Sequence, residues 1–140
     1  MRVLGLDVGD VRIGVAVSDS LGLTAQPLTV ISRKGLAADL AALRTMITAH
    51  GVDTVVVGLP LTLRGERGVQ AQRTASFGEA LKRQVPVTVT FLDERLTTVQ
   101  GERALLETGA SRRKRKHVID QVAAQLILQH FLDAKRPSAS

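Results

Sequence analysis

Hydrophobic and polar residues at the start of the chain alternate with the two-residue period of β-strands. Residues 3–8 form an apolar run, and residues 11–17 place Val11, Ile13, Val15 and Val17 at every second position. The pair Gly9-Asp10 between the two runs is typical of a tight hairpin turn. A third strand is predicted over residues 24–31. Because such alternation turns one apolar face toward the core, the chain should open with a meander of three strands.

Helical and strand patterns alternate along the rest of the chain. The predicted elements are a helix over 35–50, a strand over 54–57, a helix over 68–84, a strand over 85–92, a helix over 97–109 and a helix over 117–134. The order β-β-β-α-β-α-β-α-α predicts an α/β fold, a five-stranded mixed sheet flanked by helices. Residues 1–135 should form one domain and residues 136–140 a flexible tail.

Charge is concentrated in one short segment. The chain has 19 Lys+Arg against 13 Asp+Glu, a net charge of +6. Five adjacent residues supply nearly all of this excess: Arg112, Arg113, Lys114, Arg115 and Lys116. We expect them to form a loop before the last helix that binds a polyanion, with a merely solvated loop as the alternative. Because the chain has no Tyr or Trp and only three Phe, phosphate contacts rather than base stacking should supply the affinity.

Several classes of site and location are disfavoured by composition. The absence of cysteine excludes disulfides, thiolate zinc sites and cysteine nucleophiles. The three histidines match no metal motif in their spacing. The chain shows neither an apolar run of about 18 residues, which a membrane span needs, nor a signal-peptide pattern. A cytoplasmic protein is therefore expected.

Asp7 stands near the end of the first apolar strand, where a charge is costly unless it is bound. If Gly9-Asp10 is a two-residue turn, Asp7 lies opposite Arg12. The shared face then carries small residues, namely Gly5, Gly14 and Ala16, which would leave room for a bulky group to approach the carboxylate. A cross-strand ion pair between Asp7 and Arg12 is the structural alternative.

Two further carboxylates stand in unusual positions. Glu94 lies on the more polar face of the fifth strand if that strand continues so far, with a solvated strand end as the alternative. Asp120 shares the inward arc of the last helix with Ala123, Ile127 and Phe131, with N-terminal capping as the alternative. Three carboxylates without cysteine or a histidine cluster indicate an all-oxygen site for Mg²⁺ or Mn²⁺. Two such ions can activate water and stabilise the leaving oxygen in phosphodiester cleavage.

Four segments, taken together, resemble one protein family. They are LGLDVGDVRIGVAVSD at 4–19, VVVGLPL at 55–61, DERLTT at 93–98 and HVIDQVAAQLIL at 117–128. In sequence and order they are similar to the YqgF family, which is also described as Holliday-junction-resolvase-like. The resemblance implies a ribonuclease H-like fold and a bacterial cytoplasmic nuclease of ribosomal RNA maturation. It also implies an acidic site made of Asp7, Glu94 and Asp120.

The same motifs imply substrate contacts close to the scissile phosphate. Arg12, Arg95, Thr97 and Thr98 occupy these motif positions. Arg95 should clamp a phosphate in a bidentate way, with a salt bridge to Asp93 or Glu94 as the alternative. The sequence RGERG at 64–68 departs from the Asn- or Asp-containing turn of relatives, which affects the loop rather than the acidic site.

Four functions remain open from the sequence. The first is a metal-dependent nuclease in 5′-end maturation of pre-16S rRNA. The second is a DNA nuclease or Holliday junction resolvase, which a homodimer would favour because two sites must cut paired strands. The third is a non-catalytic nucleic-acid-binding module. The fourth follows from Asp7-Val8-Gly9, which also resembles the phosphate loop of actin-like ATPases and sugar kinases; 140 residues are too few for the two domains of those proteins. The expected partner is structured RNA or branched or single-stranded DNA, and not a membrane.

Overall fold

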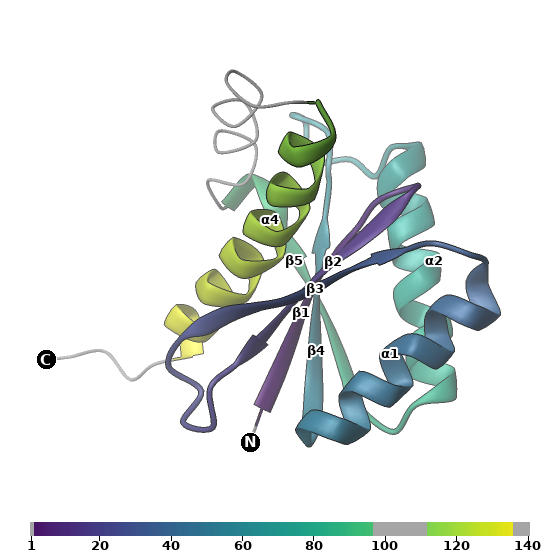
Figure 1. Ribbon diagram of the computed structural model, residues 1–140. Coiled ribbons are helices and arrows are strands. Elements are labelled where there is room, and N and C mark those ends of the chain that lie inside the picture. Colours follow the sequence, from purple (N-terminus) through teal and green to yellow (C-terminus); the bar gives the residue numbers. More distant parts are fainter. Residues whose placement is uncertain (1, 97–111, 136–140) are drawn as a thin grey trace, which may run out of the picture.

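The computed structural model describes residues 2–96 and 112–135, with only the backbone of residue 96 and residues 112–118 (Figure 1). The described elements, in chain order, are β1 (Arg2–Val8), β2 (Arg12–Ser18), β3 (Ala25–Ser32), α1 (Leu36–His50), β4 (Val52–Leu59), α2 (Val69–Gln84), β5 (Thr88–Asp93), the 3₁₀ turn η1 (Glu94–Leu96) and α4 (Arg112–Lys135). The helix predicted over 97–109 and the tail predicted over 136–140 lie outside the described residues.

The five strands form one mixed sheet in the order β3-β2-β1-β4-β5. The pairs β1–β2 and β2–β3 are antiparallel, whereas β1–β4 and β4–β5 are parallel. Helices α1 and α2 cover one face of the sheet and α4 covers the other, as Figure 1 shows. The predicted α/β fold with a five-stranded mixed sheet is confirmed.

The two faces of the sheet are packed differently. On the α1 and α2 side, branched side chains such as Leu6 and Ile13 meet Leu43 and Leu81 in a large apolar core. On the α4 side the strands present small residues, and the helix backbone comes close. A Cβ added to Gly5 would lie 2.7 Å from the Cβ of Leu128. The small-residue face predicted from the sequence is therefore real, but over most of its length it accommodates a helix rather than a ligand.

The hairpin between β1 and β2 is longer than the sequence suggested. Asp7 pairs with Gly14 and Val8 with Ile13, and the connecting loop is closed by the Gly9 N–H donating to the Arg12 carbonyl at 2.9 Å. The prediction of a two-residue turn at Gly9-Asp10 was wrong, and so was the pairing of Asp7 with Arg12 that depended on it. A register shift of two residues leaves every side chain on its face, so the assignment of residues to faces was correct.

The basic segment is another difference. We expected residues 112–116 to be a loop, but α4 begins at Arg112 and includes all five. Arg and Lys are good helix formers, so the helix continues through them instead of starting at residue 117. Among the described residues, no helix is both long and apolar enough to cross a membrane.

The path into β5 also differs from the expectation. The Val85 N–H donates to the Leu81 carbonyl and the Val87 N–H to the Val85 carbonyl, so residues 85–87 turn the chain out of α2. Pro86 has no N–H to offer to a strand ladder, and the strand begins at Thr88. Glu94 belongs to η1 rather than to the strand.

Candidate active site

Asp7 lies on the central strand between two glycines. Its partner on β2 is Gly14. On β4 the register Leu6–Val57 brings Gly58 alongside it. Asp7 shares the α4-facing parity of Gly5, and it is only 7 % exposed. Both strand neighbours lack side chains, so residues from outside β1, β2 and β4 occupy the space beside the Asp7 carboxylate.

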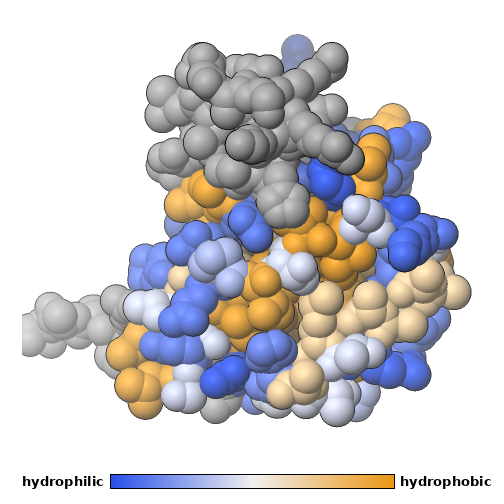
Figure 2. Space-filling model, viewed as in Figure 1, coloured by the Kyte–Doolittle hydropathy of each residue, from blue (hydrophilic) through white to orange (hydrophobic). Residues whose placement is uncertain are grey.

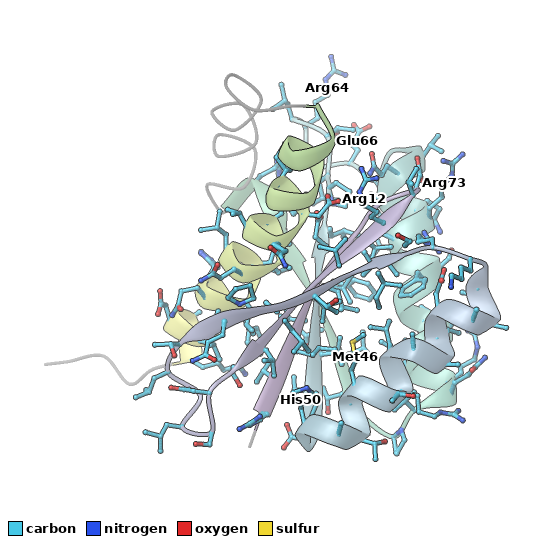
Figure 3. All side chains as sticks on the ribbon, in the orientation of Figure 1. Arg12, Met46, His50, Arg64, Glu66 and Arg73 are labelled. Atoms are coloured by element: carbon cyan, nitrogen blue, oxygen red, sulfur yellow. The ribbon has the colours of Figure 1, made fainter. Side chains whose placement is uncertain are left out.

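Asp120 of α4 covers the first of these glycines. A Cβ on Gly14 would collide with the backbone carbonyl oxygen of Asp120. The Asp120 carboxylate accepts a hydrogen bond from the Nε of Arg12 at 2.8 Å, with both side chains partly buried. Figure 3 shows Arg12 between the hairpin and α4. Asp120 stands more than two turns after the first residue of α4, so the capping alternative does not apply.

Glu94 covers the second glycine. It is 1 % exposed, and its Oε1 lies 2.7 Å from where a Cβ on Gly58 would be, beside the Ile127 side chain. The alternative of a solvated strand end is therefore wrong. The turn of η1 is what directs Glu94 toward the α4 side of the sheet.

The three predicted acidic residues are thus brought to the same face and the same end of the sheet. Asp7 stands in the middle, Asp120 lies over β2 on one side, and Glu94 lies over β4 on the other, with neighbouring strands about 4.8 Å apart. Within the described part of the chain, no three His, Cys, Asp or Glu side chains form a group spaced to hold a metal ion. The arrangement is a row centred on Asp7.

Arg95 makes the salt bridge that was the alternative to a phosphate clamp. Its Nη2 donates to Asp93 Oδ2 at 2.7 Å and its Nε to both carboxylate oxygens at 3.1 Å. These side-chain hydrogen bonds hold the pKa of Asp93 below its usual value and raise the pKa of Arg95. The Nη1 of Arg95 donates to the Leu63 carbonyl at 3.3 Å. Arg95 therefore fastens the 62–65 turn, which leads into RGERG, to Asp93, the residue before Glu94.

The remaining predicted contacts are only partly described. Thr97 and Thr98 lie outside the described residues. For Arg112, Arg113, Lys114, Arg115 and Lys116 the backbone alone is described, as the first turns of α4. These turns precede Asp120 on the same helix, at the upper end of α4 in Figure 1.

Sequence reasoning missed a pair that fixes the hairpin behind Asp7. Arg33 donates from Nη1 to the Gly9 carbonyl at 2.9 Å and from Nε to Asp39 at 3.1 Å. Burial raises the pKa of Asp39, but the Lys34 N–H and the Arg33 guanidinium outweigh it, so the pKa lies below the usual value. The available signal was the position of Asp39 on the apolar arc of α1, directly before Leu40.

Comparison with known proteins shows the family to which the chain belongs. Residues 1–134 match the family model described as "RuvX: Holliday junction resolvase". The chain belongs to the RuvX family. Two curated RuvX relatives carry the name "Putative pre-16S rRNA nuclease". The protein of Myxococcus xanthus is 54% identical over 137 residues, covering 98% of this chain and 91% of its own. That of Moorella thermoacetica is 55% identical over 133 residues, covering 95% of each chain.

Solved structures similar to this RuvX chain include two complexes with Holliday junctions. Thermus thermophilus RuvC in complex with a Holliday junction superposes with a TM-score of 0.60 at 18% identity, covering 96% of this chain and 95% of that one. The fowlpox virus resolvase in its junction complex gives 0.57 at 10% identity, covering 96% and 98%. At these identities the likeness establishes the fold, which is ribonuclease H-like as expected.

Proposed function

We propose that this RuvX chain is a divalent-metal-dependent nuclease that hydrolyses phosphodiester bonds in the 5′-end maturation of pre-16S rRNA. One observation carries the chemistry: the buried Asp7 stands between Gly14 and Gly58, with Asp120 over one and Glu94 over the other. The names of curated relatives about half identical to this chain support the substrate.

The donor set fits divalent cations. Three carboxylates offer only oxygen ligands, which Mg²⁺ and Mn²⁺ prefer, and two of them are buried, where a cation stabilises the charged form. Asp7, Glu94 and Asp120 are the residues that would hold such ions. Bound there, two ions would supply an activated water and stabilisation of the leaving oxygen.

The protein's own residues would position the acidic site and neutralise the negative charge of the substrate's phosphates. Arg12 holds the Asp120 carboxylate through its Nε at 2.8 Å, and its remaining N–H groups can donate to a phosphate oxygen. Arg95 holds the 62–65 turn next to Glu94 through Leu63. Residues 112–116 precede Asp120 on α4, and their positive charge would attract the phosphate backbone. Thr97 and Thr98 follow η1 in the sequence and complete the proposed substrate contacts.

The test is cleavage of matched substrates by purified variants. We expect wild-type protein with Mg²⁺ or Mn²⁺ to cut RNA carrying the 5′ precursor end of 16S rRNA, and a chelator to stop it. Asp7→Asn should abolish cleavage while the melting curve and RNA binding persist. Asp53→Asn, an exposed change near the start of β4, is the matched control and should cleave normally. Turnover of Asp7→Asn comparable to wild type would refute the assigned role.

A second candidate, resolution of DNA junctions, rests on the description of the matching family model. The same assay distinguishes it: cleavage of a four-way junction with no cleavage of precursor RNA would favour this candidate. A dimer in light scattering would add support, because paired cuts need two sites. Nucleic-acid binding without divalent-ion-dependent cleavage of any substrate would leave a binding module.

A further inference from the structure

A groove lies on the face of the sheet opposite the carboxylates. A pocket of about 660 Å³ is bounded by the hairpin tip, the segment before α1 and the N-terminal half of α2, and three arginines line it: Arg33, Arg67 and Arg73. A second pocket of about 220 Å³ follows α2, and its charged lining residues are Arg67, Arg83 and Glu79. Arg67, Gln72 and Ser76 line both pockets, so the two form one groove, which we call the α2 groove.

Two of its arginines are available to a ligand. Arg73 reaches Asp10 only at 3.4 Å, with both side chains about two thirds exposed, and such a pair contributes little stability. Among the described residues Arg67 has no ion-pair or hydrogen-bond partner. Figure 3 shows Arg73 at the hairpin tip over α2. Figure 2 shows hydrophilic residues interspersed with hydrophobic ones over the upper right of this view, where Figure 1 places the hairpin tip and α2.

The third arginine of the groove, Arg33, has a structural role. Its guanidinium is tied to Asp39 and to the Gly9 carbonyl, and it lies over the Phe77 ring at 5.1 Å from the ring centre. Arg33 therefore forms a fixed wall of the groove. Phe77 is buried beneath it, which leaves Leu36 and Val69 as the exposed apolar lining.

The lining indicates the class of ligand. Exposed arginines beside an apolar strip suit a chain of phosphates joined by sugars. The first turn of α2 has no acidic residue, and its cap makes no side-chain hydrogen bond, so this helix end adds to the attraction that the arginines exert on an anion. A pocket of this volume admits single nucleotides, whereas a duplex presents a broad convex surface. Single-stranded nucleic acid is the better fit.

We infer that the α2 groove binds a single-stranded segment of the substrate, with its phosphates on Arg67 and Arg73. This rests on the proposed function for the identity of the substrate. The hairpin loop stands between the two sites: Asp7 faces α4, while Asp10, three positions later, lines the groove. A strand cut beside Asp7 would cross the exposed Val11 at the hairpin tip and continue into the groove.

Binding without cleavage tests this inference. The probe is a fluorescein-labelled single-stranded RNA measured by anisotropy with a chelator present, over about 50 to 200 mM salt. The double variant Arg67→Ala/Arg73→Ala should bind about tenfold more weakly, with a salt slope smaller by about 0.7 for each phosphate that the protein no longer neutralises. Lys82→Ala removes one charge from α2 at an exposed position that lines neither pocket, and it should bind within about twofold of wild type.

The outcomes separate the two proposals. If the double variant, with an unchanged melting curve, binds the strand with the affinity and salt slope of Lys82→Ala, the groove is not a binding site, whether or not wild type cleaves. If wild type fails to cleave any substrate but the double variant loses binding, the groove stands and the nuclease assignment fails. A mononucleotide 5′-phosphate that binds with the same arginine dependence as the strand would overturn the assignment to a strand and indicate a free nucleotide.

Discussion

Arg12 and Asp120, 108 positions apart in sequence, are joined by a 2.8 Å hydrogen bond from Nε to a carboxylate oxygen. The bond connects the start of β2 to α4 directly in front of Asp7's strand neighbour, Gly14. Arg12 is therefore a positioning residue for one member of the acidic row, in addition to any contact with phosphate.

Replacing Arg12 tests this connection. Arg12→Ala should lower the cleavage rate about 10- to 100-fold, as loss of a group that orients a metal ligand does, and should raise the metal concentration needed for half-maximal activity. Arg12→Lys keeps the charge but not the planar donor, and should restore part of the loss. A rate drop with an unchanged metal requirement would assign Arg12 to the substrate alone.

A double-mutant cycle separates the two residues further. Because Arg12 acts through Asp120, the effects of Arg12→Ala and Asp120→Asn on the rate should not add. Additive losses would mean that the two side chains work independently.

Gly14→Ala should move α4 away from the sheet. The new methyl group would meet the backbone of Asp120, and backbone cannot swing aside as a flexible side chain can. We expect a loss of about 1–3 kcal/mol in the free energy of unfolding and reduced cleavage, measured by denaturant melts and turnover. At Gly68 the nearest atom to an added Cβ is 3.5 Å away, so Gly68→Ala should cost less stability. Equal costs would contradict the close approach at Gly14.

Asp39 gives the stability of the protein a pH dependence. Its folded-state pKa lies below the usual value, so its contribution is complete above the unfolded pKa of about 3.9 and is lost as the pH falls through the folded pKa. Asp39→Asn should cost about 1.5–3 kcal/mol at neutral pH and weaken the loss of stability below about pH 4. Melts of both proteins across this range measure it, and parallel curves would exclude the effect.

Neutralising residues 112–116 should weaken nucleic-acid binding without abolishing chemistry. For each phosphate that the helix no longer neutralises, the slope of log affinity against log salt should flatten by about 0.7 on a single strand. Anisotropy titrations at several salt concentrations measure the slope. An unchanged slope would remove the first turns of α4 from the interface.

Periodicity predicted the strands and helices well because each element buries one face. The assignment of Asp7 and Gly14 to one shared face survived an incorrect turn, since the register error was two residues. What periodicity lacked was the partner of that face: a strand pattern does not say whether small residues make room for a ligand or for a helix.

The three members of the acidic row could be singled out from the sequence because a carboxylate within an apolar pattern is costly unless it is bound. The hydrogen-bond partners of Arg12 and Arg95 could not be predicted in the same way. Arg12 bonds Asp120 across most of the chain, and Arg95 bonds Asp93 two positions earlier. The glutamines of α4 show the same limit: Gln125 donates to the Ala25 carbonyl and Gln129 accepts from the Ala25 N–H, contacts that only the packing of α4 on β3 creates.

The row centred on Asp7 draws its members from opposite ends of the chain. During translation, β1 to β5 emerge before α4 exists, so Asp7 and Glu94 are made while Asp120 is still missing and the small-residue face of the sheet stays open. A nascent chain that ends before α4 therefore lacks Asp120, and under the proposed function it gains cleavage activity only after this helix has been added.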